Sequence, residues 1–465
     1  MENEKKKLSR REFLKRLGAS SASAAALLGM GPLTAFANSC DSKVNPSYVQ
    51  SNPGSMTYRI NRVTQDKVSL LGYGMMRLPQ KPGSGRRGEI DQEMVNKQVD
   101  YALAHGINYF DTAPIYGGGQ SEIATGIALK RHPRESFFIA TKLSDTGDRS
   151  LEFGKKSFQT SLQKLQVDYI DYYLMHHVGA SGMDNLKERY LDNGLLDWLC
   201  EQRDKGIIRN LGFSYHGDVK VFDWLVDNND KYKFSFVQIE MNYIDWRHAS
   251  LTTGGWKRDA DAEYLYNKLE KAGIQCVVME PLLGGRLAKI PEEYSKQLKA
   301  VRPNATDANW ALRWVASHNN VLTTLSGMTT MEALIENVET FSPLDPCTSS
   351  ENDLLEKIAD GMSGMPVIPC TDCKYCMPCP YGVNIPGNFA FYNAAINNKT
   401  FPEKGTPEYK TRLTDFLKGY GETLKKSKWA SECMDCEECL PKCPQSIRIP
   451  NQMSRIMDLI RDGEA

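Results

Sequence analysis

The sequence predicts an α/β fold: a (β/α)8 barrel of the TIM type, followed by a small α-helical domain built around two groups of cysteines. At 465 residues the chain is too long for one ordinary core and suits a barrel-sized domain with a smaller one. Eight apolar runs alternate with eight segments of helical periodicity, the count that closes a parallel barrel, although doubly wound sheets share the alternation. Eight of the twelve cysteines fall in two tight groups near the C-terminus, which is typical of metal binding rather than of a disulfide framework.

The charge balance excludes one class of partner. Lysine plus arginine and aspartate plus glutamate each total 57, so the net charge is zero. A chain without a basic field has no electrostatic attraction for phosphate backbones, and we therefore expect no nucleic-acid partner.

Residues 1–37 resemble a twin-arginine signal peptide. A lysine-rich start precedes the segment Ser-Arg-Arg-Glu-Phe-Leu-Lys at 9–15, and residues 17–38 contain no charged side chain. This resemblance implies export of the folded protein by the twin-arginine machinery to the periplasm, with residues 38–56 as a linker. A disordered basic tail with an uncleaved anchor is the alternative, and a weak lipoprotein-like pattern leaves lipid attachment at Cys40 open.

The strands and helices alternate along the chain, and the first of the predicted helices has Asp91 as its cap. Apolar runs predict strands at 68–74, 107–111, 137–142, 168–176, 207–213, 235–240, 274–280 and 321–325. Helical periodicity lies between them at 91–105, 121–131, 155–165, 190–205, 217–228, 260–272, 305–318 and 330–341.

Candidate catalytic side chains follow three of these strands. Asp111 ends an apolar run, and Tyr116 follows in a turn rich in proline and glycine before a new helix begins. Lys142 and His176 end two later strands. The carboxyl ends of barrel strands meet on one face, so these four side chains are predicted to converge there. Taken alone, Asp111 could equally cap a turn.

The order acid, tyrosine, lysine, histidine resembles the catalytic tetrad of the aldo-keto reductases. That resemblance implies a tetrad of Asp111, Tyr116, Lys142 and His176, with His177 open as the alternative histidine. Reducing a carbonyl requires a proton donor at oxygen while a hydride arrives at carbon. We expect Tyr116 to be the donor, Lys142 to lower its pKa, Asp111 to hold Lys142, and His176 to orient the oxygen of a small carbonyl or alcohol substrate.

The same resemblance extends to an NAD(P) site. It implies that Ser214 and Gln238 hold the nicotinamide, although Tyr215 stands where the family usually has asparagine. The implied residues for the pyrophosphate are Pro281, Leu282 and Gly284, and those for the adenosine end are Gly327, Met328, Glu336 and Asn337. No lysine or arginine lies between 327 and 337 to meet a 2'-phosphate, so the choice between NAD and NADP stays open.

The two cysteine runs resemble those of bacterial ferredoxins and imply two 4Fe-4S clusters. The first comprises Cys370, Cys373, Cys376 and Cys379, and the second comprises Cys433, Cys436, Cys439 and Cys443. In both runs the last cysteine is followed by proline. In two-cluster ferredoxins the fourth cysteine ligates the other cluster, which pairs Cys443 with the first run and Cys379 with the second. The first run is one residue short of the pattern before Cys379. Zinc held by pairs of thiolates is the alternative to iron-sulfur clusters. The insert between the two runs, at 384–428, is predicted to be helical.

These observations predict an exported oxidoreductase with an aldo-keto reductase barrel at 57–345 and a ferredoxin-like domain at 346–465. Two alternatives remain: a barrel that only binds, with structural clusters, or an iron-sulfur electron-transfer protein with a non-catalytic barrel. Hydride carriers move two electrons and a cluster moves one. Nicotinamide cofactors are also scarce outside the cytoplasm, so either the cofactor is exported bound or electrons reach the clusters from a membrane or soluble partner.

Overall fold

The structure is a computed structural model that describes residues 48–49, 55–81, 88–144, 147–252, 260–372, 374–440, 442–443, 445 and 447–464. The chain divides into two compact units, Met1–Pro46 and Ser47–Ala465, and every described residue belongs to the second. The signal predicted at 1–37, Cys40 and Cys373 lie outside the described residues. Within the described ranges, none of the helices combines the length and the apolar character needed to cross a bilayer.

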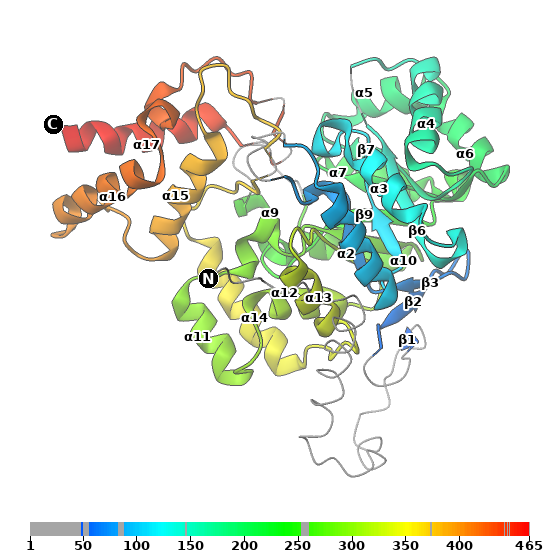
Figure 1. Ribbon diagram of the computed structural model, residues 1–465, viewed down its shortest axis with the longest axis horizontal. Helices are drawn as coiled ribbons and strands as arrows, with labels where there is room; N and C mark the ends of the chain where they lie inside the picture. The colour runs from blue at the N-terminus through cyan, green and yellow to red at the C-terminus, as the bar shows by residue number, and fades with distance from the viewer. Residues whose placement is uncertain are drawn as a thin grey trace, which may run out of the picture. The chain divides into compact units, whose positions relative to one another are not determined.

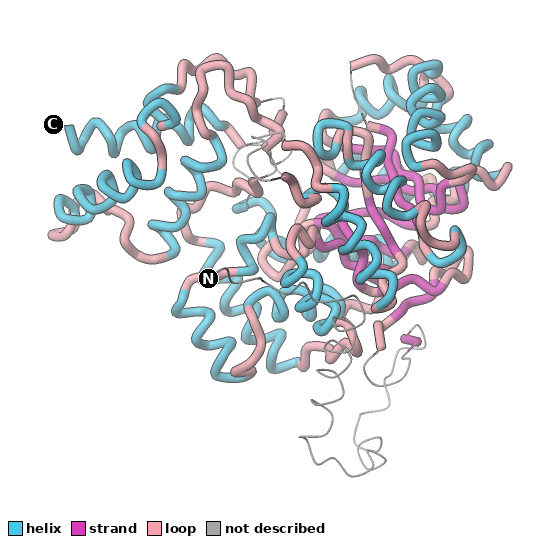
Figure 2. The backbone as a smooth tube through the Cα atoms, in the orientation of Figure 1, coloured by secondary structure: helices cyan, strands magenta, loops and turns pink. Residues whose placement is uncertain are grey.

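Eight parallel strands form a closed barrel, which confirms the predicted fold (Figures 1 and 2). Each strand pairs with the next in the chain, and β11 pairs with β4 to close the ring. The strands are β4 (Leu71–Gly74), β5 (Tyr109–Asp111), β6 (Phe138–Leu143), β7 (Ile170–Val178), β8 (Ile208–Tyr215), β9 (Phe236–Glu240), β10 (Gln275–Met279) and β11 (Val321–Ser326).

The strand predicted at 68–74 is in fact two strands. β3 (Lys67–Ser69) pairs antiparallel with β2 (Tyr58–Ile60), which pairs with β1 (Tyr48–Val49), whereas β4 belongs to the barrel. The chain turns at Leu70, where Ser69 Oγ donates to the Leu71 carbonyl oxygen at 2.7 Å. Residues on both sides of the turn are buried, so the apolar run continues through it. The boundary between β3 and β4 therefore cannot be recognised from the sequence.

Helices follow the strands at all eight predicted places, and the Asp91 side chain caps the first by accepting from the Met94 amide at 3.0 Å. These helices are α2 (Gln92–Ala104), α3 (Ser121–Leu129), α4 (Leu151–Leu165), α6 (Leu195–Asp204), α7 (Val219–Asp227), α10 (Ala262–Lys271), α12 (Asp307–Ala316) and α13 (Met331–Thr340). Further helices within the barrel region are α5 (Gly182–Leu186), α8 (Asn229–Tyr232), α9 (Asp245–Thr252), α11 (Glu292–Val301) and α14 (Ser349–Ser363).

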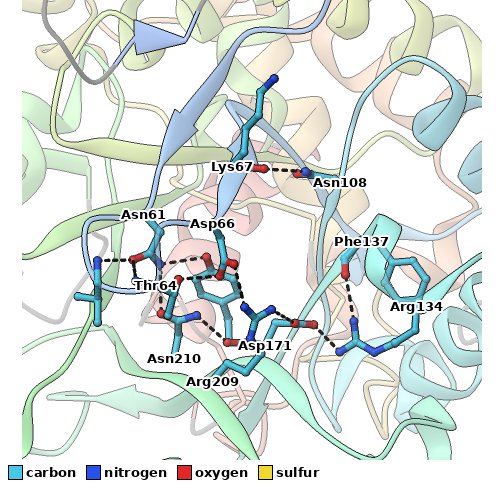
Figure 3. Close-up of polar contacts among 12 residues, drawn as sticks. Asn61, Thr64, Asp66, Lys67, Asn108, Arg134, Phe137, Asp171, Arg209 and Asn210 are labelled. Atoms are coloured by element: carbon cyan, nitrogen blue, oxygen red, sulfur yellow. Dashed lines mark hydrogen bonds and ion pairs between the residues drawn. The ribbon is translucent and has the colours of Figure 1, made fainter. Parts of the chain in front are cut away.

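The amino-terminal end of the barrel is sealed by polar contacts (Figure 3). The carboxylate of Asp171, at the start of β7, pairs with Arg134 at 2.6 Å and with Arg209 at 3.1 Å, and Arg209 pairs with Asp66 at 2.8 Å. Asn61 donates to the Tyr172 hydroxyl at 3.0 Å. With this end closed, the opposite end of the barrel is the one available for chemistry.

The C-terminal segment has a hydrophobic core of its own. α14 falls in the range assigned from sequence to the second domain, yet Leu355 and Ile358 on this helix pack into the barrel core. A separate core starts at Ile368 and is built from α15 (Ile385–Asn397), α16 (Tyr409–Thr423) and α17 (Ile449–Glu464). The predicted helical insert is therefore present, and the described part of this domain contains helices and loops (Figure 2).

Candidate active site

A buried ion pair links two neighbouring strands at the open end of the barrel. Asp111 is the last residue of β5 and Lys142 lies in β6, and both side chains are almost fully buried. Lys142 Nζ lies 2.5 Å from Asp111 Oδ1 and donates to the Thr112 carbonyl oxygen at 2.9 Å, while Gln238 donates to Asp111 Oδ2 at 3.2 Å. Burial raises the pKa of Asp111 and lowers the pKa of Lys142, and the attraction between the two charges opposes both shifts.

Tyr116 lies beside this pair. It begins a short 3-10 helix (Tyr116–Gly119), Lys142 Nζ is 4.9 Å from its ring centroid, and the His176 ring meets it edge-on at 6.2 Å between centroids. Burial raises the pKa of Tyr116 well above its usual range, and Asp111, Tyr375 and Glu280 add to the increase. The expectation that Lys142 lowers this pKa was wrong. Asp111 neutralises the Lys142 cation at close range, and the phenol therefore stays protonated and able to donate.

His176 is held in a neutral form. Burial lowers its pKa well below the usual range, and the neighbouring His177 and Lys142 lower it further. Its Nδ1 atom contacts Ser144 Oγ at 2.8 Å, which leaves Nε2 as the other ring position for a ligand. β7 runs to Val178, two residues beyond the predicted end, so His176 lies inside the strand rather than at its last position.

These side chains border a cavity of about 530 Å³. The predicted residues that line it are Asp111, Tyr116, His176, Gln238, Pro281, Leu282, Gly284, Gly327, Glu336 and Asn337. Three of the four predicted tetrad residues therefore share one cavity with predicted cofactor-binding residues. Its size falls in the range of pockets that hold small ligands and cofactors.

Three other predicted residues lie behind the cavity lining. Lys142 is covered by its pairing with Asp111, and the Ser214 hydroxyl oxygen accepts from the His177 amide at 3.3 Å. The Met328 carbonyl oxygen accepts from the Tyr73 hydroxyl at 2.8 Å. Arg77 is the one lysine or arginine among the described residues that line this cavity.

One wall of the cavity comes from the C-terminal domain, which no sequence signal revealed. Thr371 and Tyr375, which lie within the first cysteine run, line the cavity together with Gln445. Arg77 donates to the Thr371 carbonyl oxygen, and a Cβ atom added to Gly284 would lie 2.3 Å from Thr371 Cβ. The loop that carries the cysteines is thus docked against the loops that carry the predicted cofactor residues.

A second, larger cavity of about 1020 Å³ adjoins the first. Arg77, His177 and Tyr375 border both. Its remaining lining comes largely from the loop around Tyr116 and from polar side chains that include Arg149 and Asn185. This cavity therefore borders the loop that carries Tyr116.

The second cysteine run gathers around the last cysteine of the first. Cys376, Cys379, Cys433, Cys436 and Cys439 line one small hollow. Burial raises the pKa of Cys439 to about 11, with further contributions from Cys433, Cys436 and Cys379, so these four thiols lie close together. The ten cysteines within the described ranges form no disulfide.

The two cysteine loops share an uncommon backbone conformation. Asp372 and Lys374 have positive φ angles of 51° and 64°, and Asp435 and Glu437, at the same offsets from the first cysteine of their run, have 51° and 58°. Non-glycine residues rarely adopt this conformation, and successive turns of this kind point backbone amides toward an anionic group. Grouped thiols in such loops fit an iron-sulfur cluster.

Comparison with known proteins agrees with this geometry. The profile described as Aldo/keto reductase family matches residues 70–360, and that described as 4Fe-4S dicluster domain matches residues 369–447. The chain is 28% identical over 326 residues to the probable aldo-keto reductase 1 of Glycine max, covering 62% of this chain and 84% of that protein. It is 24% identical over 306 residues to the NADH-specific methylglyoxal reductase of Escherichia coli, covering 59% and 90%.

Solved structures show the same fold. The holo form of an aldo-keto reductase from Bacillus halodurans superposes with a TM-score of 0.52 at 24% identity, covering 65% of this chain and 96% of that one. An aldo-keto reductase from Klebsiella pneumoniae in complex with NADPH gives 0.51 at 18% identity, covering 66% and 95%. Because the family profile spans more than half of the sequence, this chain belongs to the aldo/keto reductase family, and it adds a C-terminal 4Fe-4S ferredoxin-type domain.

Proposed function

We propose that this protein interconverts a carbonyl compound and an alcohol by hydride transfer with a nicotinamide cofactor, and that its iron-sulfur clusters are linked to this chemistry. The observation that carries the proposal is the shared cavity. Tyr116, His176, the predicted nicotinamide contact Gln238 and the cluster-loop residue Tyr375 all line it.

Each side chain of the tetrad then has a defined task. Tyr116, a neutral phenol in its buried setting, donates its proton to the substrate oxygen. The neutral His176 donates a hydrogen bond from Nε2 to the same oxygen and fixes its direction, with Nδ1 accepting from Ser144. The Asp111–Lys142 pair fixes the wall against which the Tyr116 ring lies.

The nicotinamide cofactor, when bound, supplies or accepts the hydride. Gln238 would hold its amide, the loop at 281–284 would pass the pyrophosphate, and Glu336 with Asn337 would meet the adenosine end. Asn337 is already positioned, because its amide donates to Ser326 Oγ at 2.8 Å.

We further propose two 4Fe-4S clusters with crossed ligands. Cys370, Cys373, Cys376 and Cys443 would hold one, and Cys433, Cys436, Cys439 and Cys379 the other. The position of Cys379 among the thiols of the second run supports crossing, and the matching backbone angles of the two loops support the same kind of cluster in both. The clusters store single electrons, and the loop of the first one forms a wall of the cavity.

A specific observation favours a second candidate, an electron-transfer protein. Cys436 is exposed to solvent and the neighbouring Met434 keeps 65% of its surface accessible. A cluster at this edge would be open to a redox partner. On either reading, the sequence of residues 1–37 supports our proposal that the protein is exported by the twin-arginine route to the periplasm.

The test is turnover by Tyr116→Phe in protein purified anaerobically with its clusters. Removing the transferable proton should lower kcat for a panel of aldehydes about 100- to 10,000-fold while nucleotide affinity stays nearly unchanged. Tyr264→Phe is a matched control, since Tyr264 is 44% exposed and contacts Asp223 on the outside of the barrel. Near-normal turnover by Tyr116→Phe would refute the tetrad, and reducible clusters in a protein that binds no nicotinamide would favour the second candidate.

A further inference from the structure

Three imidazole rings gather at the mouth of the cavity. His176 and His177 lie in β7, and His216 follows β8 directly. Their ring centroids are 4.0 Å apart for His176 and His177, 4.5 Å for His177 and His216, and 5.8 Å for His176 and His216. One ring nitrogen from each histidine lies within 4.8 Å of those of the other two.

The backbone departs from a regular strand to bring two adjacent histidines together. Consecutive side chains of a strand point to opposite faces. Here the register between β7 and β8 shifts after Met175, and His177 has a φ angle of +55°. Residues with a side chain rarely adopt a positive φ, and such strain concentrates at functional sites.

Two of the three rings have a hydrogen-bond contact at Nδ1. His216 Nδ1 lies 3.2 Å from the Ser214 carbonyl oxygen, which can only accept, so Nδ1 of His216 carries a proton. Ser144 Oγ contacts His176 through Nδ1 at 2.8 Å. Metal-binding histidines usually have this second contact on the opposite nitrogen, which fixes the orientation of the ring.

We propose that His176, His177 and His216 form a binding site for a divalent transition-metal ion such as Zn²⁺. Zinc–nitrogen bonds of about 2.0–2.1 Å place neighbouring ligand nitrogens about 3.4 Å apart, so the rings must approach by roughly 1.4 Å at most. All three histidines line the cavity of about 530 Å³, from which an ion can reach them.

The consequence for turnover rests on the proposed function. Donation to a substrate oxygen requires a proton on His176 Nε2, whereas metal ligation requires a lone pair on that atom. The Ser144 hydroxyl can either donate to or accept from Nδ1, so it is compatible with both tautomers. A bound ion and a hydrogen-bonded carbonyl therefore exclude each other, and the ion is a competitive inhibitor.

The binding test uses the full-length protein with its clusters assembled and Zn²⁺ as the probe. Calorimetry and elemental analysis should show one zinc ion per chain in addition to the iron, with unchanged iron content. His177→Ala and His216→Ala should each weaken zinc binding at least tenfold. His132→Ala is the control, because His132 pairs with Asp100 on the outside of the barrel. Equal zinc affinity in the parent protein and both site variants would overturn the proposal.

The kinetic test separates this site from the proposed function. Added Zn²⁺ should raise KM for the carbonyl substrate in the parent protein without lowering kcat, and the rise should shrink at least tenfold in His216→Ala. Zinc binding without any rise in KM would overturn the inhibitory role. Absence of turnover in zinc-free parent protein would instead count against the proposed function, with the metal site still decided by the binding data.

Discussion

Two adjacent glycines allow the contact between barrel and cluster loop to be tested with a matched pair of substitutions. Gly284 and Gly285 both have positive φ angles, 66° and 97°. A Cβ atom at 284 would lie 2.3–2.6 Å from Thr371 Cβ, Cα and Cγ2, whereas a Cβ atom at 285 meets nothing within 4 Å. Gly284→Ala therefore adds a collision with the cluster loop to a backbone strain that Gly285→Ala also carries.

Backbone strain and the collision with Thr371 each carry a free-energy cost that can be estimated. An alanine in the left-handed region costs about 1–2 kcal/mol, and position 285 lies further from the left-handed minimum, so its strain is at least as large. Forcing a methyl group into a packed contact costs about 1–3 kcal/mol. The excess at 284 thus corresponds to roughly a 5- to 150-fold change in the equilibrium between docked and displaced cluster loop.

The rate at which a chelator removes iron reports this equilibrium, because a displaced loop exposes its cluster. Gly284→Ala should lose iron faster than Gly285→Ala by up to that factor, and its KM for substrate should rise because Thr371 and Tyr375 line the cavity. Thr371→Gly in the Gly284→Ala background removes two of the three colliding atoms and should partly restore both values. Equal iron loss and equal KM in the two alanine variants would refute the docking argument.

Three further predictions concern other parts of the chain. Cys379→Ala should damage the cluster of Cys433, Cys436 and Cys439, as measured by iron content and paramagnetic resonance, and damage confined to the first run would refute crossed ligation. NADH should bind at least as well as NADPH by titration, since no lysine or arginine lies between 327 and 337; a large NADPH preference would point to Arg77, which lines the cavity next to Gly327. Burial lowers the pKa of His318 to about 4, so its contribution to barrel stability is complete above pH 6.5 and is lost as the pH falls from 6.5 to about 4, by at most about 3 kcal/mol. Unfolding followed by tryptophan fluorescence should show this slope in the parent protein and a smaller one in His318→Gln.

Local patterns were enough to predict the barrel. The spacing of apolar residues, together with the turn residues between the apolar runs, identified all eight strands and their helices, because each repeat buries its own apolar residues. The convergence of the four predicted catalytic side chains could also be predicted, since three of them lie at or near the carboxyl end of a strand and Tyr116 follows in the adjoining loop. The break at Leu70 was hidden because burial continues on both sides of it.

Long-range contacts were beyond the reach of such patterns. Nothing in the spacing of the cysteines indicates that Tyr375 faces Tyr116, because this depends on how one core packs against another. The pKa of Tyr116 was mispredicted for a related reason. The pairing of Lys142 with Asp111 was expected, but the complete burial of the phenol, which is the largest cause of its raised pKa, shows only in the folded structure.

The seal at the amino-terminal end of the barrel also bears on the order in which the chain can fold. Arg59 is buried and donates to the carbonyl oxygens of Ala316, His318 and Val321, which lie about 260 residues later in the chain. The guanidinium cannot be satisfied in this way until the last barrel strand has been synthesised. Contacts between such distant segments slow folding, because the chain must first close a very long loop. β2, which carries Arg59, is therefore fixed in place late, when the barrel is complete.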